Sequence, residues 1–370
     1  MKTGKITSAI AYLLFLFVVV ELALQSFYYM TAGDFLFRRA ALPIYQQEPH
    51  AGYGNKRNLS FEHHTPEFRA RYYTNSAGFR VPRSGFKYPV AKPENSYRIL
   101  LLGPSFAYGW GVDYEKSFAA LLPRFLEARG FAPGRRIEVI NAGIPAMYAG
   151  PQLNWYKHEG ARYRPDLVIQ FVYGSMAVAA ESHQRFTVDK HGYITEQSLS
   201  PAQIWREHFK KFATVFYVWK IWTEVQDRLE PVQEKSVVGA GRAMEVPVAP
   251  FNPLGASELK SIGLYHQLKE AVQQSGSNLS VVYFPLSYAI QPEDEIRWRH
   301  LGIRNIKGQQ KFDSDFERYL NRHQIPVVNI TRDLQVAARK GPRLYYWLDI
   351  HWTAEGNAAA ARAVADRLKR

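Results

Sequence analysis

Cysteine is absent from the 370-residue chain. Its absence excludes disulfide bonds, thiolate metal ligands and cysteine nucleophiles, but it does not decide the cellular compartment. Long blocks of lysine and arginine are also missing, although the formal net charge is +14. We therefore expect a solvated basic surface that attracts anionic partners such as acidic glycans or lipid head groups. No nucleic-acid partner is expected.

Charge is nearly absent from one stretch close to the N-terminus. Between Ile6 and Met30 the only charged side chain is Glu21, so this run is long and apolar enough to cross a hydrocarbon core of about 30 Å. Lys2 and Lys5 precede it, which favours a cytoplasmic N-terminus and an extracytoplasmic body on the periplasmic side. For Glu21 we expect snorkelling to the membrane interface, and a contact with a partner is the alternative.

This apolar run is either a retained anchor or a cleaved signal peptide. The small-residue cleavage site, Leu22-Ala23-Leu24, is poor. Bulky aromatic residues, Phe27-Tyr28-Tyr29, follow at the expected interface. We therefore predict that residues 1–30 remain on the mature protein as a single-pass transmembrane anchor.

Residues 31–97 lack a strong hydrophobic period and are rich in glycine, proline and asparagine. They predict an extended arm packed on the main domain, with short strands such as one around Phe68–Thr74. His63 and His64 are adjacent in this arm, but no further ligand follows at a regular spacing, so no metal site is expected.

Residues 98–370 alternate between short apolar runs and longer helical stretches. The expected strands are Ile99–Leu102, Ile137–Ile140, Leu167–Val172, Leu279–Phe284 and Pro326–Ile330. The expected helices are 117–129, about 150–163, 256–274, 311–322 and about 354–369, and Pro123 predicts that the first is kinked or starts late. This alternation predicts a doubly wound, three-layer α/β/α domain with a parallel sheet.

A helical insertion at about 183–255 interrupts the alternation. Aromatic residues recur in it at a helical spacing, which predicts one stripe on one helix. The stripe comprises Trp205, Phe209, Phe212, Phe216 and Trp219. We expect this helix to pack on the domain. A helix lying on the membrane or against an integral-membrane partner is the alternative, because lysine and arginine residues are interspersed with the aromatics.

Polar residues follow several predicted strands and precede the last helix. Ser105 follows the first strand, Asn141-Ala142-Gly143 the second and Ser175 the third, while Asp349 and His351 lie just before the final helix. The carboxyl ends of parallel strands meet at one sheet edge, so we expect these residues to converge. Serine, aspartate and histidine in this order form catalytic triads on other α/β folds. The strained G-x-S-x-G elbow is absent, because position 107 is alanine.

Taken together, these motifs resemble the SGNH, or GDSL-like, family of esterases and acyltransferases, and in particular bacterial members with an N-terminal membrane anchor. The resemblance extends over the whole chain, including the arm motif Asn75–Arg80. Its most specific motifs are Leu100–Ser105, Gly109–Val112, Asn141–Gly143, Arg164–Asp166 and Asp349–Trp352.

The resemblance implies a flavodoxin-like SGNH fold and a role for each site residue. Ser105 would be the nucleophile and would give a backbone N–H to the oxyanion hole, with Gly143 supplying a second N–H. His351 would be the general base, oriented by Asp349. No cofactor and no metal are implied.

Two positions depart from the family pattern. Pro104 stands where the family has aspartate, and the asparagine of the third motif is replaced, with Ser175 the nearest match. Loss of one oxyanion donor costs about 10²–10³ in kcat unless another group takes its place.

These observations support two hypotheses for function. The first is an anchored extracytoplasmic serine esterase or O-acyltransferase that acts on an ester of an exported glycan or lipid through an acyl-enzyme. The second is a catalytically degenerate SGNH-like domain that serves as a binding or assembly subunit of a membrane protein complex. The intact set of Ser105, Gly143, Asp349 and His351 favours the first.

Overall fold

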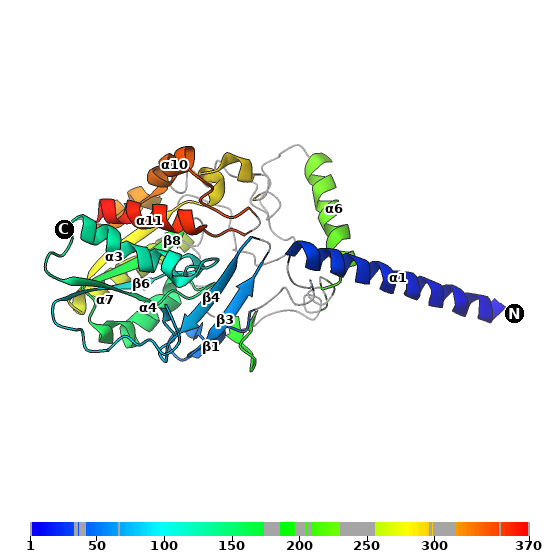
Figure 1. The fold of residues 1–370 in the computed structure, drawn as a ribbon, viewed down its shortest axis with the longest axis horizontal. Helices are drawn as coiled ribbons and strands as arrows, with labels where there is room; N and C mark the ends of the chain where they lie inside the picture. The colour runs from blue at the N-terminus through cyan, green and yellow to red at the C-terminus, as the bar shows by residue number, and fades with distance from the viewer. Residues whose placement is uncertain are drawn as a thin grey trace.

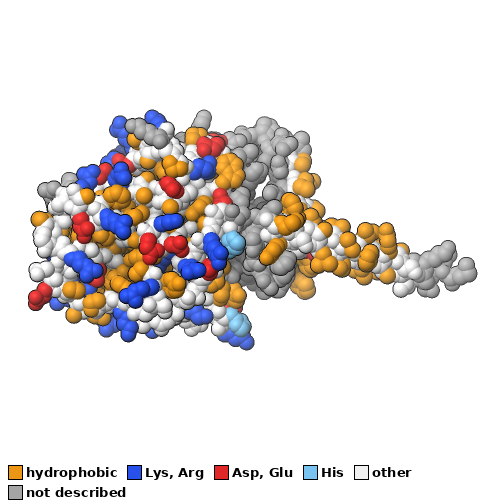
Figure 2. All heavy atoms as spheres, in the orientation of Figure 1, with side chains coloured by type: hydrophobic (Ala, Val, Ile, Leu, Met, Phe, Trp, Pro, Cys, Tyr) orange, Lys and Arg blue, Asp and Glu red, His pale blue; other side chains and the backbone are white. Residues whose placement is uncertain are grey.

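A computed structural model describes most of the chain. The described residues are 2–32, 36, 42–65, 67–173, 186–196, 205, 209, 211–229, 256–295, 298, 316–347 and 349–368. Helix α1 (Lys2–Ala32) extends away from the globular body, and its stretch Ile6–Met30 is long and apolar enough to cross a membrane (Figure 1). Hydrophobic side chains predominate along the coloured part of this helix, whereas charges of both signs are spread over the globular body (Figure 2).

The core of the body is a parallel sheet built around β6 (Ser96–Leu102). Four other strands join it in the order β12-β11-β8-β6-β7, and each neighbouring pair is parallel. They are β7 (Arg136–Asn141), β8 (Leu167–Tyr173), β11 (Asn278–Phe284) and β12 (Val327–Asn329). Ile99 to Leu102 are 0% exposed, as expected of a central strand covered on both faces.

Helices cover both faces of this sheet. Side chains of β6 alternate between two cores: Ile99 and Leu101 join the first, and Leu100 and Leu102 join the second. The first core also receives α3 (Phe118–Ala128), α10 (Thr331–Lys340) and α11 (Ala354–Arg367), and the second receives α4 (Ala149–His158) and α7 (Ala256–Gln274). The predicted three-layer α/β/α fold is therefore confirmed (Figure 1).

The helix predictions need three corrections. Helix α3 begins at Phe118 and continues through Pro123, so it does not start late. The stretch predicted at about 150–163 ends its α-helical part at His158, and a short 3-10 helix, η3 (Gly160–Tyr163), follows. Helix α10 was not anticipated. Of the helix predicted at 311–322, residues 316–322 are helical and the rest lies outside the described residues.

The N-terminal arm extends the sheet. Strands β3 (Ser60–His64), β4 (Arg69–Thr74) and β5 (Arg80–Val81) add to it in antiparallel fashion, with β5 pairing with β7 at Arg80 and Asn141. The predicted strand at Phe68–Thr74 corresponds to β4. Two hairpins lie outside this sheet and are formed by β1 (Tyr45–Glu48) with β2 (Gly52–Asn55), and β9 (Phe186–Val188) with β10 (Ile194–Glu196).

Within the insertion, the aromatic residues do not form one continuous helical stripe. Helix α6 (Ala213–Leu229) begins after a turn and bend at Lys211-Phe212, which separates Trp205 and Phe209 from it. This helix packs against α1, since the ring centroids of Phe216 and Tyr28 are 5.9 Å apart. The side chain of Trp219 and the loop expected at 231–254 lie outside the described residues.

Glu21 also departs from the expectation of snorkelling. Its carboxylate accepts hydrogen bonds from the backbone N–H groups of Ala213 and Thr214, at 2.7 and 2.9 Å. The only charge in the apolar run therefore joins α1 to the first turn of α6.

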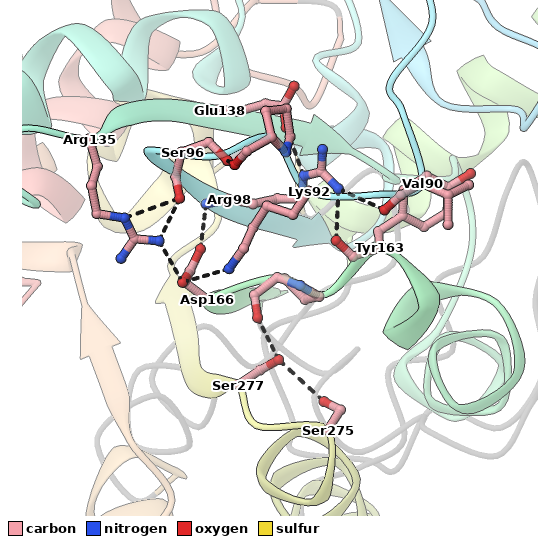
Figure 3. Close-up of polar contacts among 12 residues, drawn as sticks. Val90, Lys92, Ser96, Arg98, Arg135, Glu138, Tyr163, Asp166, Ser275 and Ser277 are labelled. Atoms are coloured by element: carbon pink, nitrogen blue, oxygen red, sulfur yellow. Dashed lines mark hydrogen bonds and ion pairs between the residues drawn. The ribbon is translucent and has the colours of Figure 1, made fainter.

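The amino ends of the central strands are held by a polar network around Asp166 (Figure 3). Its carboxylate accepts from the Arg98 backbone N–H at 2.7 Å, from Lys92 Nζ at 2.9 Å and from Arg135 Nη2 at 2.8 Å. The buried Arg98 guanidinium donates in turn to Glu138 at 2.7 Å. The motif around Asp166 therefore joins β6, β7 and β8 at the edge opposite Ser105.

Replacing Asp166 by asparagine should lower the free energy of unfolding at pH 7 by roughly 2 kcal/mol, because charge-assisted hydrogen bonds are lost. Burial alone would raise the pKa of Asp166, but its bonds to Arg135, Arg98 and Lys92 hold the pKa below the ordinary 3.8. The ionised carboxylate therefore stabilises the fold fully at neutral pH, and this contribution is lost as the pH falls below 3.8.

Urea unfolding from neutral to acid pH measures the difference in the free energy of unfolding between wild type and Asp166→Asn. This difference should shrink toward acid pH. Asp366→Asn, which breaks a surface ion pair with Arg129, is the matched control and should change stability by less than about 1 kcal/mol. A difference for Asp166→Asn that does not depend on pH would contradict the account.

Candidate active site

Ser105 is placed at the carboxyl end of β6 by a tight turn. Gly103 has φ +151°, and a Cβ there would lie 2.6 Å from Phe171 Cβ, so the turn requires glycine. Ser105 is the first residue of a short helix, α2 (Ser105–Tyr108), which Pro104 precedes in an extended conformation. The proline at the position of the family aspartate is therefore compatible with the turn. This end of β6 lies between β7 and β8, where the strand order reverses and where open α/β sheets bind ligands.

Ser105, His351 and Asp349 form a continuous hydrogen-bonded chain. Ser105 Oγ lies 2.5 Å from His351 Nε2, and His351 Nδ1 lies 2.5 Å from Asp349 Oδ1. The His351 backbone N–H also donates to Asp349 Oδ1 at 2.9 Å. With Nδ1–H donated to Asp349, the imidazole presents Nε2 to the serine hydroxyl, which is the arrangement of a nucleophile, a base and an orienting carboxylate.

The environment of the chain keeps Asp349 ionised. Burial alone would raise the pKa of Asp349, but the His351 imidazole and the nearby His63 hold it below its ordinary value. Phe106 and Trp110 pack against the His351 ring at 4.8 and 5.8 Å between centroids. An ionised carboxylate beside a largely buried imidazole can stabilise the positive charge that the ring acquires when it takes the serine proton.

The loop that carries His351 is held from both sides. An isolated bridge pairs Tyr345 with Trp352, and Thr353 Oγ1 caps α11 by accepting the Gly356 N–H at 3.1 Å. On the other side, the Glu67 carboxylate accepts the Asp349 N–H at 2.8 Å and the Trp347 N–H at 2.5 Å. Glu67, which lies between β3 and β4 of the arm, therefore fixes the aspartate backbone.

The turn after Ser105 is held by the buried Arg80 of the arm. Arg80 is 0% exposed, and its guanidinium donates to the carbonyl oxygens of Tyr108 at 2.7 Å and Val112 at 2.5 Å, and also to that of Gly109. Burial lowers the pKa of Arg80, yet an arginine stays charged at neutral pH. Several backbone carbonyls therefore converge on one cation, which fixes the course of the chain after the nucleophile.

Gly143 lies close to the helix that Ser105 begins, but its N–H is engaged. It donates to the side-chain oxygen of Asn141 at 3.0 Å, and Asn141 Nδ2 donates to the Ala107 carbonyl at 2.9 Å. A Cβ at Gly143 would lie 2.4 Å from Tyr108 N, so this glycine allows α2 to approach β7 closely. In this state of the protein, Gly143 positions α2, and its role as an oxyanion donor stays a prediction. Ser175 lies outside the described residues.

Two of the residues that support the site were missed by sequence reasoning. Arg80 was noted only as part of a motif. Glu67 was not singled out, because a segment without hydrophobic periodicity does not indicate which of its side chains face the rest of the protein. His63 lies in an aromatic cluster with Phe68 and Trp110, with ring centroids 5.1 and 5.0 Å apart. His63 therefore lies half-buried among aromatic rings.

Glu67→Ala should lower kcat toward an ester substrate by about 10- to 100-fold with little change in KM, because small displacements of catalytic groups are costly. Glu67→Gln should lose less, since its amide oxygen still accepts one of the two N–H groups. Steady-state kinetics with both variants measure the effects on kcat and on KM separately. Glu62→Ala, which removes a nearby arm carboxylate that pairs with Arg69 and Arg71, is the control. Wild-type kcat in Glu67→Ala would overturn the positioning role.

A comparison with protein-family models finds a match for the C-terminal part of the chain. Residues 255–370 match the family model described as an SGNH hydrolase-like domain of the acetyltransferase AlgX. The matched part is less than half of the chain; it includes Asp349 and His351 but not Ser105. No curated protein sequence matches the chain.

Several solved structures are similar to the chain at low identity. An acetyl xylan esterase is 11% identical, with a TM-score of 0.41 over 74% of this chain and 100% of its own. A G-D-S-L family protein from Desulfitobacterium hafniense is 14% identical, with a TM-score of 0.39 over 74% and 100%. A GDSL-like lipase from Bacteroides thetaiotaomicron is 14% identical, with a TM-score of 0.38 over 75% and 90%.

Proposed function

We propose that this chain, whose residues 255–370 match the model of an SGNH hydrolase-like domain, is a membrane-anchored extracytoplasmic serine esterase or O-acyltransferase. Its substrate is an ester of an exported glycan or lipid. One observation carries the proposal: the side chains of Ser105, His351 and Asp349, which come from two loops far apart in the sequence, are joined in one hydrogen-bonded chain.

The proposed reaction has two transfers at one serine. Ser105 Oγ attacks the acyl carbonyl while His351 Nε2 takes the hydroxyl proton, and a tetrahedral intermediate forms. His351 then gives that proton to the departing alcohol, which leaves an acyl group on Ser105. In the second transfer, His351 removes a proton from water or from an acceptor hydroxyl, whose oxygen attacks the acyl-enzyme and releases the serine. Asp349 remains ionised throughout.

The tetrahedral oxyanion requires hydrogen-bond donors. The backbone N–H of Ser105 is the first, since it lies in the opening turn of α2, where N–H groups have no partner within the helix. A second donor from Gly143 requires its N–H to turn from Asn141 to the substrate, and Ser175 is the candidate for a third.

The choice of an exported glycan or lipid ester rests on two further features. The matching family model is named for an acetyltransferase, which favours transfer of a short acyl group. The net charge of +14 favours substrates that carry acidic groups.

The anchored topology is supported by contacts of α1 within the chain. Glu21 and Gln25 of α1 bond to backbone groups at or just before the start of α6. Tyr28 packs against Phe216 of α6, and Phe17 packs against Phe212, which precedes this helix. Removal of α1 as a signal peptide would break all these contacts and expose an apolar surface. A retained helix is therefore the interpretation that these contacts favour.

The covalent step is tested by labelling the full-length protein with a fluorophosphonate probe. We expect wild type to be labelled and Ser105→Ala to be unlabelled, with the same thermal unfolding midpoint in both, because the change removes a single oxygen. Thr353→Ala, a nearby hydroxyl that caps α11, is a control and should still be labelled. Absence of labelling in wild type, or equal labelling in Ser105→Ala, would favour a scaffold subunit instead.

Retention of α1 is tested by mass spectrometry of the mature protein purified from membranes. The expected product begins at or near Met1 and contains the peptide with Glu21. A mature N-terminus between residues 24 and 35 would refute the anchor while leaving the proposed chemistry intact.

A further inference from the structure

Helix α6 and the residue before it contact the C-terminal half of α1. The rings of Phe216 and Tyr217 lie 5.9 and 6.1 Å from those of Tyr28 and Phe27, while Phe212 packs against Phe17. All three α1 residues belong to the apolar run Ile6–Met30. When α1 crosses a bilayer, the start of α6 therefore lies at the depth of the leaflet on the side of the domain.

The polar groups at the start of α6 are satisfied by α1. The Glu21 carboxylate accepts the N–H groups of Ala213 and Thr214 and, at 2.6 Å, the Thr214 hydroxyl. Gln25 Nε2 donates to Glu21 at 2.8 Å and to the Lys211 carbonyl at 2.9 Å. The first N–H groups of a helix have no partner within it, and water is absent from the hydrocarbon core. This arrangement is what a helix beginning inside a membrane requires.

The face of α6 turned away from α1 is apolar and exposed. It is formed by side chains at a helical spacing that are between 36% and 63% exposed. They are Val215, Val218, Ile221, Trp222 and Val225. Isolated exposed apolar residues are ordinary in proteins, but a contiguous helical face beside a membrane-crossing helix marks an interaction site.

The distribution of charge along α6 fits a helix that leaves the membrane toward its C-terminus. From Ala213 to Thr223 the only charged residue is Lys220, whereas Glu224, Asp227 and Arg228 follow within the last turns. In Figure 1 the helix leaves α1 at a steep angle and does not run alongside it. Figure 2 shows hydrophobic atoms on α6 next to those on α1.

We propose that α6 is a second membrane element, whose exposed apolar face lies among the lipid acyl chains of the leaflet on the domain's side. Glu21 and Gln25 fasten its first turn to α1, so that the two helices form one membrane unit. The inference rests on the anchored topology proposed above, and it goes beyond it by assigning a lipid surface to the insertion. The charge in the apolar run then serves to hold α6 at depth.

The absence of cysteine allows a direct test with single nitroxide labels in full-length protein reconstituted into phosphatidylcholine and phosphatidylglycerol vesicles. Labels are placed at Val218→Cys and Trp222→Cys on α6. Val18→Cys on α1 reports the anchor, and Glu94→Cys on the domain surface reports water. Power-saturation measurements compare the collision of each label with oxygen, which concentrates in lipid, and with a water-soluble nickel complex.

We expect labels at positions 218 and 222 to be reached by oxygen and to lose access to the nickel complex, as at position 18 and unlike position 94. Nickel access at 218 and 222 with lipid exposure at 18 would overturn the inference while the anchor stands. Immobile labels reached by neither reagent would show a protein contact instead and would also overturn it. Nickel access at position 18 would refute the anchored topology itself.

The role of Glu21 is tested in the same experiment by Glu21→Leu combined with Val218→Cys. The leucine is compatible with the bilayer but removes the acceptor for Ala213 and Thr214, so the label should gain nickel access as α6 leaves the lipid. Leu22→Ala, a neighbouring change that leaves the acceptor in place, is the control. Unchanged lipid exposure in Glu21→Leu would exclude the fastening role. Fluorophosphonate labelling of each variant separates these outcomes from loss of the catalytic site.

Discussion

The buried guanidinium of Arg80 is the interaction on which the geometry of the site depends most. Burying a charge is costly unless hydrogen bonds compensate it, and here backbone carbonyls around α2 accept from both terminal nitrogens of the guanidinium, while Nε has no partner. The arginine also lies over the rings of Tyr72 and Tyr108, at 4.6 and 5.1 Å from their centroids. The arm is thereby joined to the turn that carries Ser105, while Glu67 joins it to the loop that carries Asp349. Both halves of the proposed triad are thus positioned by the same N-terminal segment.

Much of the fold follows from local patterns in the sequence. The buried strands are short apolar runs, so their existence could be predicted, and parallel pairing then brings Ser105 to the edge where ligands bind. The convergence of Asp349 and His351 with Ser105 followed from the family resemblance and from this topology. The contribution of the arm did not, because residues such as Glu67 act through backbone contacts that leave no periodic signal.

The structure of the insertion could be predicted from the sequence only in part. Its aromatic spacing is helical, but a spacing alone does not reveal that the chain bends at Lys211-Phe212 or that the following helix packs on α1. The hydrogen bonds of Glu21 could likewise not be predicted from the sequence, because its partners, Ala213 and Thr214, contribute backbone N–H groups. In the proposed topology, these contacts hold the start of α6 beside the membrane-crossing part of α1. In Figure 1 the loop that leads into α11, which carries His351, lies on the side of the body that faces α1.

The central claim is that Ser105 is activated by His351, and the rate of its covalent modification tests this most directly. The second-order rate constant for phosphonylation should fall by several orders of magnitude in His351→Ala, and peptide mapping should find the adduct of the wild-type protein on Ser105. An adduct on another residue, or an equal rate constant in His351→Ala, would contradict the account.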